Sequence, residues 1–211
     1  MRIVGLLGGT LDPVHNGHLR IGLEVMQAMS MEELRFIPCA DPPHKSSTNA
    51  DYAQRSAMLK FGIAGVEGFS LDDREFHRQG PSYTIDTLRS VRNELGNDVS
   101  ICWIVGSDSF QTLDTWHEWE ALFDFAHFVV ACRPGWQRDA HSEMGKKLAD
   151  RFVSDPFKLE QKRAGYIMPW QVTQLAISAT EIRKKVKNGE SPRFLVPDDV
   201  ASFIELNGLY K

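Results

Sequence analysis

The chain has few cysteines and no long uninterrupted apolar run. Cys39, Cys102 and Cys132 are its only cysteines, and they lie far apart with no Cys-x-x-Cys pair, which favours buried, reduced thiols. The most apolar stretch, 123–132, contains an aspartate and a histidine, so it is not expected to span a membrane. The first residues lack the charged and apolar regions of a signal peptide. We therefore expect a cytoplasmic protein with no membrane partner.

A large excess of basic residues is also absent. The 211 residues include 24 lysines and arginines against 28 aspartates and glutamates, which gives a formal charge of −4 and a pI near 6.0. This balance predicts no general attraction to nucleic acid, so an anionic substrate has to be bound by a local group of positive residues. The length and the 42% hydrophobic content predict one domain over 1–211, with a C-terminal helical segment at about 178–211 packed on it.

Short apolar runs alternate with stretches of helical periodicity along the whole chain. Such alternation is typical of an α/β fold with a doubly wound, Rossmann-like parallel sheet that carries helices on both faces. In these sheets, ligands bind beyond the carboxyl ends of the strands, near the point where the strand order reverses. The pattern predicts strands at 2–7, 34–38, 69–72, 99–105, 127–131 and 165–168, and helical segments at 18–29, 51–65, 83–95, 107–122, 140–153, 178–188 and 197–207.

The stretch from Gly8 to His18 follows the first predicted strand and contains the strongest functional signal. Gly8 and Gly9 let the backbone turn sharply and approach a ligand closely, and the next helix is expected to open at His18. The start of a helix attracts phosphate through its unpaired N–H groups and its dipole. His15 and His18, three residues apart, converge on the same spot if this turn is helical. The spacing therefore predicts phosphate chemistry.

Polar loops follow three other predicted strands, at 41–45, 106–109 and 133–135. Asp108 follows a strand and a glycine, where a carboxylate can accept hydrogen bonds from two ribose hydroxyls. Lys45 can approach a phosphate, and Arg133 can reach the nucleotide. The alternatives are an N-cap role for Asp108 and solvent-facing charges for the other two.

Two motifs, one near each end of the chain, resemble those of the HxGH nucleotidylyltransferase superfamily. Gly8-Gly9-Thr10-Leu11-Asp12-Pro13-Val14-His15-Asn16-Gly17-His18 is similar to GGTFDPxHxGH, and Ile177-Ser178-Ala179-Thr180-Glu181-Ile182-Arg183 is similar to ISSTxIR. Leu11 departs from the usual phenylalanine and Ala179 from the usual second serine, so the Ala179 side chain is given no phosphate contact. Similar segments elsewhere, such as Pro42-Pro43-His44-Lys45, Thr115-Trp116-His117 and Asn207-Gly208-Leu209-Tyr210, extend the resemblance over nearly the whole chain, to the bacterial nicotinate-nucleotide adenylyltransferases.

The resemblance implies an enzyme that joins ATP to nicotinate mononucleotide, giving the dinucleotide and pyrophosphate in NAD biosynthesis. It implies catalytic roles for His15, His18 and Arg183, with His18 on the α-phosphate through the transition state. Mg²⁺ is expected with ATP, held by phosphates and water because no carboxylate cluster is visible. The ATP-binding residues it implies are Gly8, Gly9, Thr10, His15, His18, Asp108, Arg133, Ile177, Ser178, Thr180 and Arg183, and those for the mononucleotide are Gly9, Thr10, Lys45, Thr84, Trp116 and His117.

The acceptor is the most specific part of this prediction. The pyridinium ring of the mononucleotide is cationic, and the face of an indole such as Trp116 attracts it. The resemblance implies that the backbone N–H groups of Thr84 and His117 bind the nicotinate carboxylate. A carboxylate needs donors only, whereas an amide also needs an acceptor, so this region favours nicotinate over nicotinamide.

Each of these residues also has a structural explanation. One histidine can be a helix-capping or packing residue, and Ser178 with Glu181 forms the pattern of a capping box, a role compatible with phosphate binding. Trp116 can be a core residue beside its aromatic neighbours. A metal site built from Asp12 and the two histidines is disfavoured, because Pro13 and Gly17 make the turn unlike the rigid helix of a zinc enzyme.

Two alternative functions remain open at this point. One keeps the fold and mechanism but changes the acceptor to nicotinamide mononucleotide, phosphopantetheine or an alcohol phosphate. The other is a non-catalytic nucleotide-sensing module, against which the intact pair of motifs speaks, since a sensor needs no transition-state contacts. The sequence assigns no oligomeric state, and it gives no role to the remaining histidines, His44, His77, His127 and His141.

Overall fold

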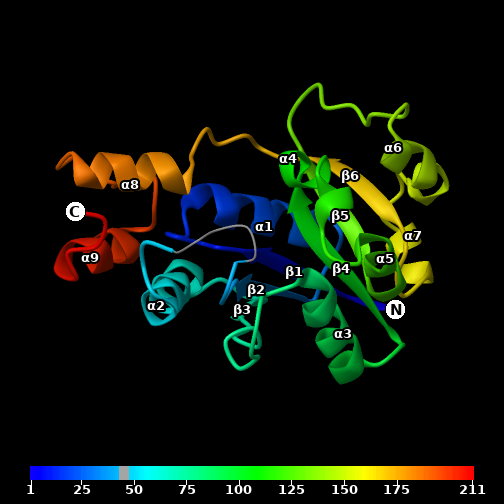
Figure 1. Ribbon diagram of the computed structural model, residues 1–211, viewed down its shortest axis with the longest axis horizontal. Coiled ribbons are helices and arrows are strands. Elements are labelled where there is room, and N and C mark those ends of the chain that lie inside the picture. Colours follow the sequence, from blue (N-terminus) through cyan, green and yellow to red (C-terminus); the bar gives the residue numbers. More distant parts are fainter. Residues whose placement is uncertain (43–47) are drawn as a thin grey trace.

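The computed structural model describes residues 1–42 and 48–211, and its described part contains one parallel sheet of six strands (Figure 1). The strand order is β3-β2-β1-β4-β5-β6, so the chain winds outward from the neighbouring strands β1 and β4 in both directions. This confirms the doubly wound, Rossmann-like fold predicted from the sequence. The strands are β1 (Arg2–Gly9), β2 (Glu33–Pro38), β3 (Phe69–Leu71), β4 (Val99–Gly106), β5 (His127–Cys132) and β6 (Ile167–Gln171).

Helices cover both faces of the sheet because its strands bury both sets of alternating side chains. In β1, Ile3 and Leu7 join one core cluster, and Val4 and Leu6 join the other. The first cluster receives apolar residues from α1 (Asn16–Ala28), α2 (Tyr52–Ile63), α8 (Ala179–Lys187) and α9 (Asp198–Leu206), and the second from α3 (Thr84–Leu95) and α5 (Leu122–Phe125). Figure 1 shows α8 and α9 at one end of the molecule, with α9 beside α2. No helix in the described part is long and apolar enough to cross a membrane.

Several predicted segments differ from the structure, among them the last strand, which is Ile167–Gln171 rather than 165–168. The first strand runs two residues further than predicted, and the helix after it begins at Asn16 rather than at His18. The segment 107–122 is not one helix, because short turns take its apolar residues into the core one at a time: α4 (Ser107–Phe110), two 3-10 turns (Leu113–Thr115 and Trp119–Ala121) and the start of α5. Likewise, the predicted helix 140–153 is α6 (Glu143–Lys147) and a 3-10 turn (Ala149–Arg151), followed by α7 (Lys158–Gln161). Such short pieces depend on packing rather than on helical periodicity.

The cysteines are free thiols, as predicted. Cys102 and Cys132 are buried, whereas Cys39 is partly exposed. Burial raises the pKa of Cys39 and Cys132 to about 11 and that of Cys102 to about 12. Their thiols are therefore protonated at neutral pH and are poor nucleophiles.

His127, which the sequence left without a role, is a buried structural residue at the start of β5. Its Nε2 lies 2.7 Å from the carbonyl oxygen of Lys162, and its Nδ1 accepts from the backbone N–H of Tyr166 at 2.9 Å. The ring must therefore be neutral, with its proton on Nε2. Burial lowers the pKa of His127 to about 4.

We expect this histidine to make the fold sensitive to acid. In the unfolded chain a histidine titrates near 6.5, so from pH 6.5 down to pH 4 the unfolded state binds a proton that the folded state does not. The stabilisation is complete above pH 6.5 and is lost as the pH falls, by about 3 kcal/mol for this one group. Urea unfolding at pH 7 and pH 4.5 measures the loss.

His127→Asn should be less stable than the wild type at pH 7 but should lose less stability between the two pH values. His141→Asn, which removes an exposed imidazole, is the matched control and should behave as the wild type. An equal acid loss in His127→Asn and the wild type contradicts the assignment.

Candidate active site

The turn after β1 is set by packing at Gly8 and by an unusual conformation at Leu11. Gly8 and Gly9 still belong to the strand and pair with Ile37 and Pro38. A Cβ on Gly8 would lie 2.5 Å from the ring of Trp103 on β4, so this glycine makes room for an indole. The backbone reverses after the glycines, at the buried Leu11 with φ 51°. The prediction that the two glycines themselves form the sharp turn is therefore wrong.

The Asp12 side chain ties this turn to two other parts of the chain. Its side chain is 3% exposed and accepts from the backbone N–H groups of Asn49 (2.8 Å) and Ala50 (3.2 Å) and from the hydroxyl of Tyr210 (2.7 Å). Burial and the Asp12 carboxylate raise the pKa of Tyr210 well above its usual value, so its hydroxyl stays a donor. The carboxylate that the sequence offered as a possible metal ligand is thus occupied in holding the loop.

A buried arginine of α2 holds the same loop through a second hydrogen bond. Arg55 on α2 is 1% exposed and donates from Nη1 to the carbonyl oxygen of Thr10 at 2.7 Å. Desolvation lowers the pKa of Arg55, but an arginine remains charged at neutral pH. The loop between β1 and α1 is therefore held at both Thr10 and Asp12.

His15 and His18 converge, as their spacing predicts. Their ring centroids are 3.7 Å apart, and the planes are inclined by 25°. His15 is the N-cap residue of α1, and its backbone N–H donates to Nδ1 of His18 at 3.3 Å. A neutral His18 ring therefore carries its proton on Nε2 and presents a single N–H donor.

Both imidazoles are neutral in the absence of an anion. Burial lowers the pKa of His15 to about 4, and burial, together with the repulsion between the two rings when both are protonated, holds the pKa of His18 well below its usual value. The Nδ1 atom of His15 is buried and has no hydrogen-bond partner in the described part of the chain. Two desolvated imidazoles with an unused nitrogen form a site that an anionic ligand can complete, because a nearby phosphate favours the protonated forms.

Gly17 separates the two histidines for a steric reason. A Cβ at this position would lie 3.0 Å from Nδ1 and Cε1 of His15 and 3.8 Å from the carbonyl oxygen of Ile177. Any larger residue would displace the His15 ring or the segment carrying Ile177. The close approach of the chain at residue 177 also shows that the second motif lies against the first.

Arg183 joins the two motifs directly. Its Nη1 donates to the carbonyl oxygen of Asp12 at 2.6 Å, across 171 residues of sequence, and its Nη2 donates to Oγ1 of Thr180 at 3.2 Å. Ser178 is the N-cap of α8, and its hydroxyl accepts from the N–H of Glu181 at 3.2 Å, which confirms the capping role predicted for it. The remaining N–H groups of the first turn of α8 have no carbonyl partner within the helix and can bind an anion.

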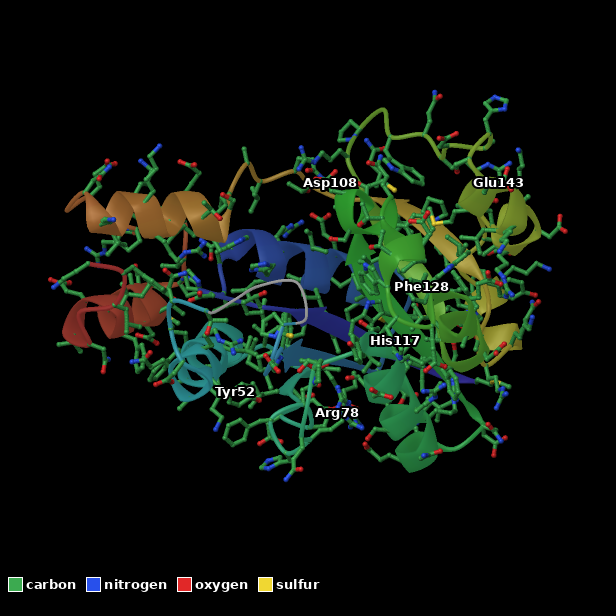
Figure 2. All side chains as sticks on the ribbon, viewed as in Figure 1. Tyr52, Arg78, Asp108, His117, Phe128 and Glu143 are labelled. Atoms are coloured by element: carbon green, nitrogen blue, oxygen red, sulfur yellow. The ribbon has the colours of Figure 1, made fainter. Side chains whose placement is uncertain are left out.

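The loops after β4 and β5 bring a second pair of predicted residues together. Asp108, in α4, accepts from Nη2 of Arg133 at 3.1 Å, and both side chains are exposed. Figure 2 shows Asp108 at the end of β4, near α4. Since every strand of the sheet is parallel, this pair lies at the same edge as the loop after β1.

The segments predicted to bind the acceptor also meet. Thr84 is the first residue of α3, so its N–H has no intrahelical partner. The ring of the preceding Tyr83 packs on that of His117, with centroids 4.4 Å apart. Trp116 is partly buried and packs against the second core cluster, which leaves part of its indole accessible. Lys45 lies outside the described residues.

Sequence reasoning missed the residues that hold the site together. The helical pattern at 51–65 does not distinguish Arg55 from a surface arginine. Tyr210 stands in a segment that matches the family, and that match is the only signal that could have pointed to it. Asp12 was considered only as a metal ligand. Among the described residues, no group of three or more His, Cys, Asp or Glu is arranged to hold a metal ion.

Comparison with known proteins agrees with this architecture. The model of the cytidylyltransferase-like family matches residues 6–185. The chain is 43% identical over 208 residues to an Aeromonas salmonicida protein named "Probable nicotinate-nucleotide adenylyltransferase", and the match covers 99% of this chain and 97% of the relative. It is 46% identical over 208 residues to a Pseudomonas aeruginosa protein of the same name, with the same coverage. In fold it resembles the Plasmodium falciparum nicotinic acid mononucleotide adenylyltransferase complexed with NaAD, with a TM-score of 0.75 and 17% identity over 100% of this chain and 98% of that one. The chain belongs to the nicotinate-nucleotide adenylyltransferases of the cytidylyltransferase-like family.

Proposed function

We propose that the chain transfers the adenylyl group of ATP to nicotinate mononucleotide, forming nicotinate adenine dinucleotide and pyrophosphate in NAD biosynthesis, with His15, His18 and Arg183 as its catalytic residues. The observation that carries the assignment of these residues is the 2.6 Å hydrogen bond from Arg183 to the carbonyl oxygen of Asp12. It places the guanidinium of the second motif on the loop that leads to the two imidazoles. On this basis the three cationic or proton-donating groups are proposed to border one space.

The reaction makes one P–O bond and breaks another. A phosphate oxygen of the mononucleotide attacks the α-phosphorus of ATP, and the bond to the bridging oxygen of pyrophosphate breaks. The attacking phosphate has a second pKa near ~6 and is largely dianionic at neutral pH, so it needs no general base. The protein has to hold two anions in line and to neutralise the charge that develops.

His18 is suited to the α-phosphate because its tautomer is set by the protein. The His15 backbone N–H occupies Nδ1, so the Nε2–H is available to a phosphate oxygen. His15 binds the neighbouring phosphates with a ring that has no other partner at Nδ1 in the described part of the chain. Gly8, Gly9 and Thr10 line the approach to these rings.

The β- and γ-phosphates then lie at the start of α8. The backbone of Ser178 and Thr180 offers N–H groups there, whereas the N–H of Ile177 donates to the carbonyl oxygen of Leu175 at 2.7 Å. Arg183 adds charge-assisted hydrogen bonds through the N–H groups that are not committed to Asp12 and Thr180. Asp108 and Arg133 bind the nucleoside end, where the carboxylate accepts from the ribose hydroxyls.

The mononucleotide occupies the other side, between the loop after β1 and the start of α3. Trp116 stacks on the cationic pyridinium ring. The N–H groups of Thr84 and His117 bind the carboxylate, and Lys45 with Gly9 and Thr10 binds the phosphate. Tyr83 supports this arrangement because its ring joins the two segments that carry the donors.

Mg²⁺ is proposed to enter with ATP as part of the substrate. The described residues do not provide a carboxylate cage for it, and Asp12, the carboxylate beside the histidines, already accepts four hydrogen bonds. This arrangement supports an ion held by phosphate oxygens and water, as is usual for Mg²⁺.

A pyrophosphate-release assay with ATP and three acceptors tests the proposal. We expect rapid release with nicotinate mononucleotide, slower release with nicotinamide mononucleotide because its amide N–H₂ faces donors, and none above background with phosphopantetheine. The dinucleotide product should appear in equal amount to pyrophosphate. A preference for phosphopantetheine would overturn the acceptor, and no release with any acceptor would favour a nucleotide-sensing module.

A further inference from the structure

The segment 72–83, between β3 and α3, holds an arginine against the start of α3. Arg78 donates from Nη2 to the carbonyl oxygen of Tyr83 at 3.4 Å and from Nη1 to Oγ1 of Thr87 at 3.2 Å. Figure 2 labels Arg78 on this segment and His117 on the stretch between β4 and β5. The guanidinium therefore bridges the N-cap residue and the first turn of the helix.

A buried acid, Glu75, orients the hydroxyl of Thr87 that Arg78 contacts. The hydroxyl of Thr87 donates to Oε1 of Glu75 at 2.7 Å, and the two residues are 0% and 5% exposed. A guanidinium can only donate, so Oγ1 of Thr87 accepts from Arg78, while the single proton of that hydroxyl is directed to Glu75 rather than to the more distant carbonyl oxygen of Tyr83 at 3.4 Å. Arg78 is thus held in one orientation by a network that faces the helix start.

The charge of Arg78 differs from that of the neighbouring arginines. Arg74 forms ion pairs with Asp72 (2.6 Å) and Glu94, and Arg89 pairs with Glu118 (2.6 Å). Arg78 has no carboxylate oxygen within 4.0 Å in the part of the chain that the structure describes, and the acid of its network, Glu75, is reached only through the hydroxyl of Thr87. Its partly buried positive charge therefore has only neutral partners.

The carbonyl that Arg78 contacts belongs to the same peptide group as the N–H of Thr84. A cation on the oxygen side of a peptide polarises it and makes the N–H a stronger donor. The orientation of that N–H is fixed at the same time. Both effects favour a negatively charged partner in front of Thr84 more than a neutral one.

We infer that Arg78 sets the preference of the enzyme for an acceptor with a carboxylate over one with a neutral carboxamide. The inference rests on the proposed function, in which the N–H of Thr84 binds the nicotinate carboxylate. Arg78 acts through the Tyr83–Thr84 peptide, so it is a positioning residue rather than a catalytic one. Its effect is on the acceptor, and ATP binding is independent of it.

The test compares kcat/KM for nicotinate mononucleotide and for nicotinamide mononucleotide in Arg78→Gln. We expect a loss of about tenfold for the nicotinate substrate, a change of less than about threefold for the nicotinamide substrate, and an unchanged KM for ATP. Arg78→Lys keeps the charge without the planar guanidinium and should recover part of the preference. Arg2→Gln removes an exposed arginine at the opposite edge of the sheet and should match the wild type.

The outcomes separate the inference from the function on which it rests. If Arg78→Gln leaves the ratio of kcat/KM for the two acceptors unchanged, the role of Arg78 is overturned. If Arg78→Gln does not fold, the same result in Arg78→Lys overturns it. Thermal unfolding of each variant identifies a folding defect. If the wild type itself does not use nicotinate mononucleotide, the proposed function fails, and the inference fails with it.

Discussion

Replacing His18 with alanine should lower kcat by about 10²- to 10³-fold while the chain stays folded, by analogy with the removal of an oxyanion donor. The ring is only partly buried, and its Nε2–H has no partner in the described part of the chain, so its loss leaves no cavity in the core. The interaction that disappears is the one to the α-phosphate. Steady-state kinetics with saturating ATP and nicotinate mononucleotide measure the effect.

Two further variants separate the phosphate contact from the helix cap. In His18→Asn, the amide oxygen can still accept from the His15 N–H, but no donor reaches the position of Nε2, so we expect activity as low as in the alanine variant. In His18→Gln, the amide N–H₂ lies near that position and should restore part of kcat. His77→Ala, an exposed histidine, serves as the control. Full activity in His18→Asn would show that His18 only caps α1.

Arg183→Ala should lower kcat/KM for ATP by about 10²-fold, the effect of losing charge-assisted hydrogen bonds of about 1.5–3 kcal/mol each. The variant loses both the contact to the triphosphate and the anchor on the Asp12 carbonyl. We therefore expect KM for ATP to rise and kcat to fall together. Thermal unfolding in the presence and absence of ATP measures the loss of binding independently of turnover.

Lys184→Ala is the matched control for this variant. Lys184 is exposed on the neighbouring position of α8, and its removal changes the net charge equally. It should keep ATP kinetics within about twofold of the wild type. Arg183→Lys should recover only part of the activity, since an ammonium cannot bridge Asp12 and a phosphate as a guanidinium does. Equal effects of Arg183→Ala and Lys184→Ala would contradict the proposed role.

The sheet and the meeting of the two motifs were predictable because they depend on patterns that occur throughout the chain. Alternating apolar runs fix the strands, and parallel strands bring their carboxyl ends to one edge. The convergence of His15 and His18 was predictable because their spacing matches one helical turn. The capping role of Ser178 followed from the local sequence alone, since a cap is made with residues three positions away.

The long-range hydrogen bonds of the site could not be derived from such patterns. Asp12 resembles a metal ligand in sequence, and only the fold brings Asn49, Ala50 and Tyr210 to its carboxylate. Gly8 resembles a turn residue in sequence. In the structure it is a glycine because the ring of Trp103 leaves no room for a side chain at this position. Both errors arise because contacts between distant parts of the chain decide the role of the residue.

The two long helices that were predicted wrongly, at 107–122 and 140–153, have a different cause of error. In 107–122 and 140–153 the core-packed residues stand at helical spacing, as Met144 and Leu148 do, yet the chain forms only short pieces there, and the start of α6 is set by a local cap at Ser142. Propensity and periodicity describe long amphipathic helices well and short turns poorly. Asp108 and Arg133, which are predicted to bind the nucleoside end, nevertheless lie together, because they follow strands whose positions were predicted well.

The hydrogen bond between Asp12 and Tyr210 has a consequence for how the protein matures during synthesis. The two residues are 198 positions apart, so a ribosome adding about 5–20 residues per second makes the second about 10–40 s after the first. Until then, the nascent loop lacks the hydroxyl that its buried carboxylate accepts. The segment of the site that is translated first is thus among the last to reach its final form.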